Sequence, residues 1–246
     1  PTQARAAWFD AAWPLRRAID VTWDAEHSSG DDLGYAEFYA AGRVDPDGKD
    51  VRVATDDGKL IPSEVLMVGP GDRVRIAFML QKNVNKYDVY WGNPNPAPSK
   101  LTVNYHRGML LEMKVFPGGP SNNWKEMQRA WENAKETVGR TIVDRPFLGN
   151  NVLGDEKLTV SKLTGQLFAP IDGPYEFAMA ADDRAELLID GKPLVHVPRG
   201  AFADTRYNGT IDLHRGPHEM VIYHVDFGGD WKLSLGWKRP DMQRVE

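Results

Sequence analysis

Two adjacent carboxylates, Asp182 and Asp183, are the residues best suited to chemistry, because they fall between two segments with strand character. Before them, Tyr175, Phe177 and Met179 alternate with other residues at the period of a half-buried strand. Aspartate often stabilises a turn through its side-chain oxygens, so the pair serves either the turn or a ligand. The elements on both sides decide where the two carboxylates point.

The segment after the pair is a predicted strand that ends in a tight turn. Leu187 and Ile189 belong to an alternating run, and Asp190-Gly191 is a dipeptide typical of two-residue hairpins. Glycine suits this turn because it adopts positive φ without a Cβ clash. A third strand is expected next, so residues 172–197 are predicted to hold three short strands.

One amphipathic helix is predicted in the second half of the chain. Asn123 can cap its first turn, and Glu126 lies three residues later in the position of a capping box. Gly139 is expected to end it. Apolar residues recur along it at helical spacing, namely Trp124, Met127, Trp131 and Ala134.

Two further segments are predicted to be irregular. Residues 140–157 are expected to form a loop. The dipeptide Asn208-Gly209 is a strong type I′ signal and predicts a hairpin turn between Tyr207 and Ile211.

Composition limits the class of protein. The chain has 246 residues, a formal net charge of −5 spread without blocks, and no cysteine, so no disulfide framework exists. The lack of a basic patch argues against nucleic acid as a partner. The lack of a long apolar run argues against membrane insertion. Because the chain starts at Pro1, we expect that a preceding segment was removed and that any signal peptide lay there.

The first half carries three motifs that resemble the bacterial domain of unknown function of the DUF-2341 type. They are Trp13 to Arg17, Lys49-Asp-Val-Arg-Val53 followed by Asp57-Gly58, and Tyr90-Trp-Gly-Asn-Pro94. The resemblance covers about residues 13–96. It implies a concanavalin-like jelly-roll sandwich and no known catalytic residues.

The second half resembles the protective-antigen (PA-14) domain family over about residues 107–240. Four motifs carry the resemblance, in the family's order: Gly173-Pro-Tyr-Glu-Phe177, Asp182-Asp183 with Leu188-Ile189-Asp190-Gly191, Gly209 to Gly216 with the strand to His224, and Trp231 to Trp237. The family consists of β-sandwiches found in toxins, adhesins, glycosidases and secreted bacterial proteins.

This resemblance implies a calcium site at Asp182 and Asp183, with Asp226 or Asp230 completing it from the loop before the last strand. Calcium takes six to eight oxygen ligands. Successive side chains of a strand point to opposite faces, so two adjacent carboxylates converge only where the backbone turns sharply, as a cis peptide would allow. Many members have glycine where this chain has Arg184, and its guanidinium offers a metal-free alternative by pairing with either aspartate.

The resemblance also implies sugar binding through the calcium ion. Trp231, Phe227 and Tyr207 are candidate stacking residues, and Trp231 is expected at the rim of the site. We therefore expect a non-catalytic, extracytoplasmic carbohydrate-binding or adhesion module with a glycan or polysaccharide as partner. A metal-free structural or protein-interaction spacer is the alternative. A glycoside hydrolase fragment is a weaker one, because 35 acidic residues produce carboxylate pairs by chance.

Together these patterns predict an all-β protein with two β-sandwich, jelly-roll-like domains. We expect an N-terminal arm at 1–12, a concanavalin-like sandwich over 13–100, and a PA-14-like sandwich with one α-helix over 101–246.

Overall fold

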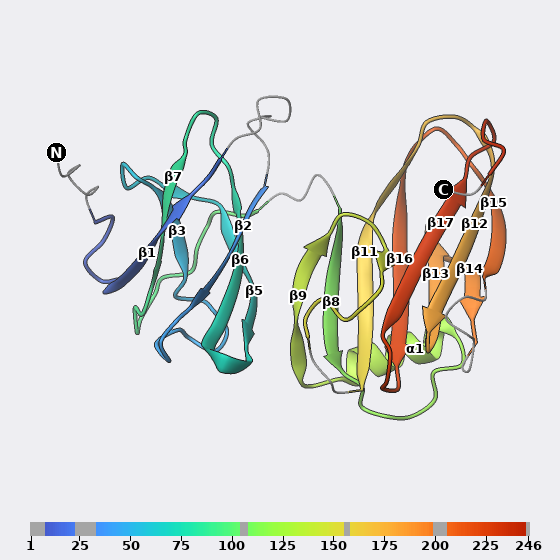
Figure 1. Ribbon diagram of the computed structural model, residues 1–246, viewed down its shortest axis with the longest axis horizontal. Coiled ribbons are helices and arrows are strands. Elements are labelled where there is room, and N and C mark those ends of the chain that lie inside the picture. The colour runs from blue at the N-terminus through green and yellow to red at the C-terminus, as the bar shows by residue number, and fades with distance from the viewer. Residues whose placement is uncertain (1–7, 23–32, 104–107, 155–157, 199–205, 245–246) are drawn as a thin grey trace. The chain divides into compact units, whose positions relative to one another are not determined.

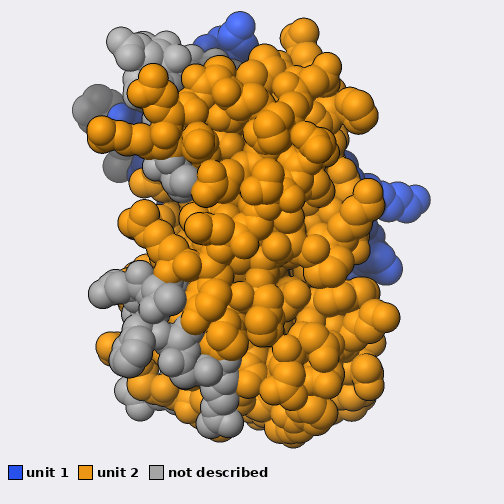
Figure 2. Space-filling view, turned by 90° about the vertical axis from the view of Figure 1, so that its right-hand side faces the viewer, with its two compact units in different colours: residues 1–106 blue, residues 107–246 orange. Residues whose placement is uncertain are grey.

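The computed structural model describes residues 8–22, 33–103, 108–154, 158–198 and 206–244. By its contacts the chain divides into two compact units, residues 1–106 and 107–246 (Figures 1 and 2). The described residues form four sheets and one α-helix, which confirms the predicted all-β class. No helix among them is long and apolar enough to cross a membrane.

Unit 1 is a sandwich of two antiparallel sheets. The first has the order β1-β7-β3-β4, with bounds Leu15–Asp20, Lys86–Trp91, Arg52–Thr55 and Leu60–Ile61. The second has the order β2-β6-β5, with bounds Leu33–Tyr39, Arg73–Met79 and Ser63–Gly69, and a 3-10 turn η1 lies at Pro70–Asp72. Apolar side chains of both sheets share one core, including Val53, Val89 and Trp91 from the first and Phe38, Ile76 and Phe78 from the second.

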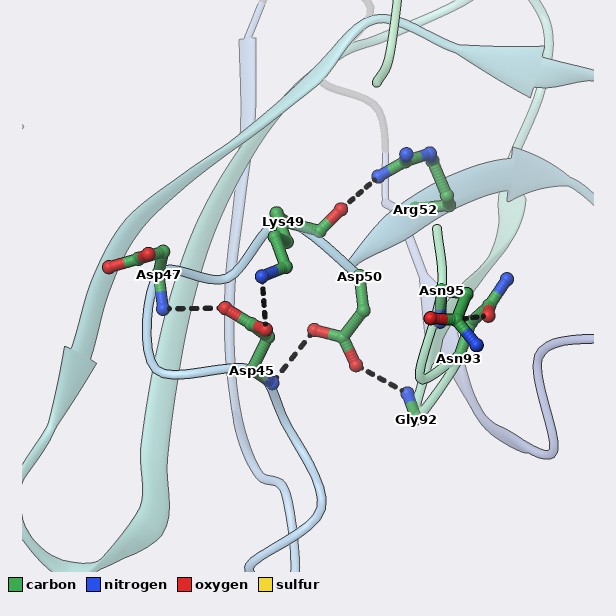
Figure 3. A network of polar contacts seen from close by, with 8 residues as sticks. All are labelled: Asp45, Asp47, Lys49, Asp50, Arg52, Gly92, Asn93 and Asn95. Carbon is green, nitrogen blue, oxygen red and sulfur yellow. Dashed lines mark hydrogen bonds and ion pairs between the residues drawn. The ribbon is translucent and has the colours of Figure 1, made fainter. Parts of the chain in front are cut away.

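Asp50 is the centre of a polar network in unit 1 (Figure 3). It is 2% exposed. Its carboxylate accepts hydrogen bonds from the backbone N–H groups of Asp45 (2.9 Å) and Gly92 (2.7 Å). Its backbone oxygen accepts another from Nε1 of Trp13 (2.6 Å). Burial of a carboxylate is tolerated only when its oxygens are hydrogen-bonded, and donors from separate segments meet that need here.

Arg52 extends this network (Figure 3). Its Nη1 donates to the carbonyl oxygens of Lys49 (2.8 Å) and Val51 (2.7 Å), and its Nη2 donates to that of Ala97 (2.5 Å). Its guanidinium carbon lies 5.5 Å from the centroid of the Trp13 ring. The three motifs noted in the first half of the sequence therefore lie together. Their hydrogen bonds connect the start of β1, the start of β3 and the end of β7.

Unit 2 is also a sandwich, with a six-stranded and a four-stranded sheet. The larger sheet has the order β14-β13-β16-β11-β8-β9, with bounds Lys192–Val197, Arg184–Ile189, Gly216–Asp226, Thr159–Ala169, Met109–Val115 and Thr137–Val143. The smaller has the order β10-β17-β12-β15, with bounds Phe147–Leu148, Lys232–Lys238, Gly173–Asp182 and Tyr207–Leu213.

The predicted inward face of β12 is confirmed, because Tyr175, Phe177 and Met179 are all at most 1% exposed. The tight turn after β13 is confirmed as well. Asp190 and Gly191 have φ of 48° and 72°, as a type I′ turn requires.

The single helix, α1, spans Trp124–Asn133 and packs on the larger sheet of unit 2 through Met127. The predicted cap is confirmed, since Oδ1 of Asn123 accepts from the N–H of Glu126 at 3.1 Å. The predicted end at Gly139 was wrong. From residue 137 the chain is strand β9, rich in β-branched residues, and its pairing with β8 takes precedence over continued helix.

Two predictions of irregular structure were also wrong. The segment 140–157 contains most of β9 and all of β10. Asn208-Gly209 lies inside strand β15 rather than in a turn. Glycine is needed there for space, because a Cβ on Gly209 would collide with the carbonyl oxygen of Leu194 on the neighbouring β14.

We expect Asp50→Ala to destabilise unit 1 by about 2–4 kcal/mol, because two partly buried backbone N–H groups lose their acceptor. Calorimetric unfolding checks this. Asp47→Ala is the matched control, since Asp47 is exposed in the same loop and contributes only its backbone N–H to the network. Equal unfolding temperatures for the two variants would contradict the role given to Asp50.

A second prediction concerns His218, which joins two turns of unit 2. Its Nδ1 lies 2.7 Å from Oδ2 of Asp190, and its Nε2 lies 2.7 Å from the carbonyl oxygen of His214. Both partners accept only, so the protonated ring, with an N–H at each nitrogen, satisfies both of them. The carbonyl of His214, and after it Asp190, raises the pKa of His218 above its ordinary 6.5.

A raised pKa in the folded state adds stability that is complete below about pH 6.5 and is lost as pH rises through the folded value. The melting temperature of His218→Gln should therefore lie furthest below that of the native protein at mildly acidic pH, and the gap should narrow at alkaline pH. His214→Gln, with a side chain 98% exposed, serves as control. A difference in melting temperature that grows as pH rises would contradict a raised pKa for His218.

Candidate functional site

The paired aspartates lie where strand β12 passes into β13 in unit 2. Asp182 is the last residue of β12, Arg184 is the first of β13, and Asp183 alone lies between them. The peptide bond between the two aspartates is cis. Both side chains are partly exposed.

The carboxylate of Asp183 is held by the loop that follows β16. Its Oδ2 accepts a hydrogen bond from the backbone N–H of Phe227 at 2.7 Å. At the start of this loop, Oδ1 of Asp226, the last residue of β16, accepts from the N–H of Gly228 at 3.0 Å. The bond from Phe227 joins the turn after β12 to the loop after β16, whereas the bond from Gly228 orders the loop itself.

His224 contacts the same turn through the backbone of Asp182. It is fully buried on β16, and its Nε2 lies 2.7 Å from the carbonyl oxygen of Asp182. A carbonyl oxygen only accepts, so Nε2 carries the proton and donates. Burial lowers the pKa of His224 to about 4, so its ring is neutral at neutral pH. Sequence reasoning missed this role, for which a histidine between apolar strand residues was the only available signal.

The acidic residues of the site influence one another. Burial raises the pKa of Asp226 to about 6, and the charges of Asp183 and Asp182 add to that effect. Burial also raises the pKa of Asp182, followed by the charges of Asp183 and Asp230. This electrostatic strain is what a cation placed among them would relieve.

No three His, Cys, Asp or Glu side chains of the described ranges converge closely enough to hold a metal ion by themselves. A calcium ion at this turn would therefore rely on two carboxylates at most in close contact. The rest of its six to eight oxygens would come from backbone carbonyls, water or a ligand. The residues present fit such an ion in charge and in donor type.

Arg184 is 7% exposed, and its Nη1 donates to Oγ of Ser121 at 2.8 Å, in the segment leading to α1. Its guanidinium carbon lies 5.7 Å from the centroid of the Phe227 ring. Arg184 thus connects the aspartate turn to the segment before the helix. Ser121 did not stand out in the sequence, because nothing there places it near β13.

The three candidate stacking residues have different surroundings. Trp231 is 5% exposed and packs edge-on against His224 at 4.7 Å, so the expectation that it forms the rim is corrected: its ring belongs to the core. Phe227 is half-buried, with its ring 5.5 Å from that of Phe116. Tyr207 is partly exposed on the edge strand β15, opposite Met179 of β12, and so lies toward the same end of the sheet as the aspartates.

Comparison with protein families matches residues 157–246 to the model described as "PA14 domain", which confirms the resemblance seen in the second half of the chain. This range contains all the acidic residues of the site. No curated protein matches the chain.

Several solved structures are similar at low identity. The "PA14 sugar-binding domain from RTX adhesin" is 21% identical, with 57% of this chain and 93% of that one covered and a TM-score of 0.46. The epithelial adhesin 9 A domain of Candida glabrata in complex with Galb1-4GlcNAc is 9% identical, with coverage of 57% and 85% and a TM-score of 0.44. An "anti-sigma factor domain-containing protein" is 13% identical, with coverage of 94% and 80% and a TM-score of 0.46.

The role of His224 leads to a third prediction. His224→Phe fills the same space but removes the donor to the carbonyl of Asp182, and it should destabilise unit 2 by about 1–3 kcal/mol. His224→Gln places an amide N–H near the position of Nε2 and should lose less. Denaturant unfolding followed by tryptophan fluorescence compares the two. Equal losses would mean that packing, and not the hydrogen bond, explains the residue.

Proposed function

We propose that unit 2 is a non-catalytic carbohydrate-binding module of an extracytoplasmic bacterial protein, in which Asp182 and Asp183 bind Ca²⁺ and, through it, a glycan. When bound, the ion supplies positive charge and coordination positions for hydroxyl oxygens. The observation that carries the proposal is the meeting of two loops that bring Asp182, Asp183 and Asp226 within electrostatic reach of one another. The PA14 match over the same residues supports it.

Asp183 has the strongest claim to be a ligand. One of its oxygens is committed to the N–H of Phe227, which fixes the orientation of the whole carboxylate. Asp182 is oriented through its backbone, by His224. Positioning of this kind lowers the entropy lost when an ion binds, because the ligand atoms are already in place.

Asp226 and Asp230 play different parts in this proposal. Asp226 is 5% exposed and is close enough to Asp182 and Asp183 for the charges to interact, so its ionised form makes the site more negative. Asp230 is exposed and raises the pKa of Asp182 by its charge, so it is the better placed of the two to approach an ion from the solvent side. Of the aromatic candidates, Tyr207 and Phe227 keep exposed surface for a sugar ring.

A hydrolase is the second candidate, favoured by one observation. Asp226, with a pKa raised to about 6, stands near two further carboxylates, a combination that glycosidases use for acid catalysis. Its burial and its bond to the N–H of Gly228 turn it away from a substrate, so binding is the better reading. Turnover of a chromogenic glycoside panel that disappears in Asp226→Ala would establish the hydrolase instead.

The test of calcium binding is a thermal melt of the full chain with Ca²⁺ or with a chelator. An ion that binds only the folded state stabilises it by about 2.7 kcal/mol at a free concentration of about 100 times Kd. Asp183→Asn keeps an oxygen for the N–H of Phe227 but removes the charge. It should fold normally and lose the calcium-induced rise in melting temperature.

Asp212→Asn is the matched control, because Asp212 is exposed on β15 opposite Pro174, at the far end of the strand pair from the site. It should keep the full calcium response. Glycan-array binding should then require calcium in the native protein and in Asp212→Asn, and should be absent from Asp183→Asn. Identical melts with calcium and chelator, or undiminished glycan binding by Asp183→Asn, would refute the proposal.

A further inference from the structure

Unit 2 contains a cleft away from the paired aspartates. Its volume is about 480 Å³, within the range of roughly 300–1,000 Å³ typical of small-molecule sites. Its walls come from both sheets of the sandwich and from the connection between β9 and β10. Phe177 and Met220 line it, five and six residues along their strands from Asp182 and Asp226, which corresponds to roughly 17–20 Å.

The cleft exists because the two sheets are unequal. Beyond β17 the smaller sheet continues only as the two-residue strand β10, held by the pairing of Phe147 with Ser234 and of Leu148 with Leu233. The larger sheet continues through β11, β8 and β9 on its side. The gap left between them is lined by backbone and side chains of both, with Met109 and Phe177, each at most 3% exposed, at its base.

Two aromatic rings face this cleft and are suited to stacking. Trp237 is held in place by Tyr175, with ring centroids 5.5 Å apart and planes inclined by 24°. Phe147 is 64% exposed at the mouth, where the guanidinium carbon of Arg145 lies 5.7 Å from its centroid. Because Phe147 belongs to the lining of the cleft, its exposed ring adds to the apolar surface that a small-molecule site presents to a ligand.

The polar groups at the mouth are a carboxylate, a guanidinium and an amide. They belong to Asp144, Arg145 and Gln166, all exposed. Acceptors and donors thus occur together, with no net charge. A hydroxyl group donates and accepts at once, so a ligand rich in hydroxyls satisfies all three, whereas a purely anionic or cationic ligand satisfies only one sign.

We propose that this cleft is a second saccharide-binding site, which takes one or two pyranose rings without a metal ion. The apolar face of a ring would stack on Trp237 and Phe147, and its hydroxyls would bond with Asp144, Arg145 and Gln166. This inference does not rest on the calcium site, because no residue is shared between the two. A chain with both sites would engage a glycan at two points or bind two different glycans.

The test uses the full chain in excess chelator, so that the calcium site cannot contribute. Saturation-transfer NMR with maltose, cellobiose, lactose and N,N′-diacetylchitobiose as probes should detect binding of at least one of them. Phe147→Ala should weaken that binding by roughly fivefold to tenfold, the loss expected for one aromatic stacking contact. Gln166→Ala should weaken it as well.

Phe168→Ala is the matched control, because Phe168 is 61% exposed in the same unit but does not line the cleft. It and Asp183→Asn should bind the disaccharide as the native protein does. Because Phe147 is exposed, its removal should leave the melting temperature unchanged, which separates a lost contact from a lost fold.

Three results would overturn the proposal. One is that none of the four disaccharides binds in chelator. The second is that Phe147→Ala and Phe168→Ala bind equally well. The third is that the native protein forms dimers that Phe147→Ala abolishes, because a second copy would then be what covers this ring. Loss of calcium binding in Asp183→Asn tests only the first site, so failure of one proposal leaves the other open to its own test.

Discussion

The candidate site depends on hydrogen bonds that fasten one turn to one loop. The bond from the N–H of Phe227 to Asp183 and the bond from His224 to the carbonyl of Asp182 join the end of β12 to the end of β16. Without them, the carboxylates of Asp182, Asp183 and Asp226 would separate into solvent, and burial would no longer raise the pKa values of Asp182 and Asp226. With them, the fold holds like charges together, and that arrangement gains most from a bound cation.

Each unit contains a buried aspartate with hydrogen-bonded oxygens, but the charges around the two aspartates differ. In unit 1, Asp50 accepts from two backbone N–H groups, and its surroundings include Arg52 and Lys49, so the network is complete within the protein. In unit 2, Asp226 is buried beside two other acidic residues, and burial with their charge raises its pKa to about 6. A network in which every buried polar group is hydrogen-bonded stabilises the fold. A cluster of carboxylates without a positive partner can instead bind a cation.

The wrong predictions share one cause. In each case a contact that forms only in the folded chain overrides the local sequence pattern. The helix was expected to reach Gly139, but that residue belongs to β9, which pairs with β8. Asn208-Gly209 has the composition of a turn, yet the close approach of Leu194 requires glycine in a strand. Trp231 was expected at the rim, and its contact with His224 draws it into the core. The strand β8 and Leu194 lie far in sequence from the segments that they contact, and even His224 belongs to a different strand from the one that follows Trp231.

The all-β class, the helix cap, the hairpin at Asp190-Gly191 and the position of Asp182 and Asp183 between two strands could be predicted from the sequence alone, because alternation, turn dipeptides and caps act over a few residues. The sequence could not show that Phe227 and His224 orient the pair, that Arg184 reaches Ser121, or that unequal sheets leave a cleft beside Phe147. Those features arise where separate strands meet, and local patterns carry no information about which strands those are.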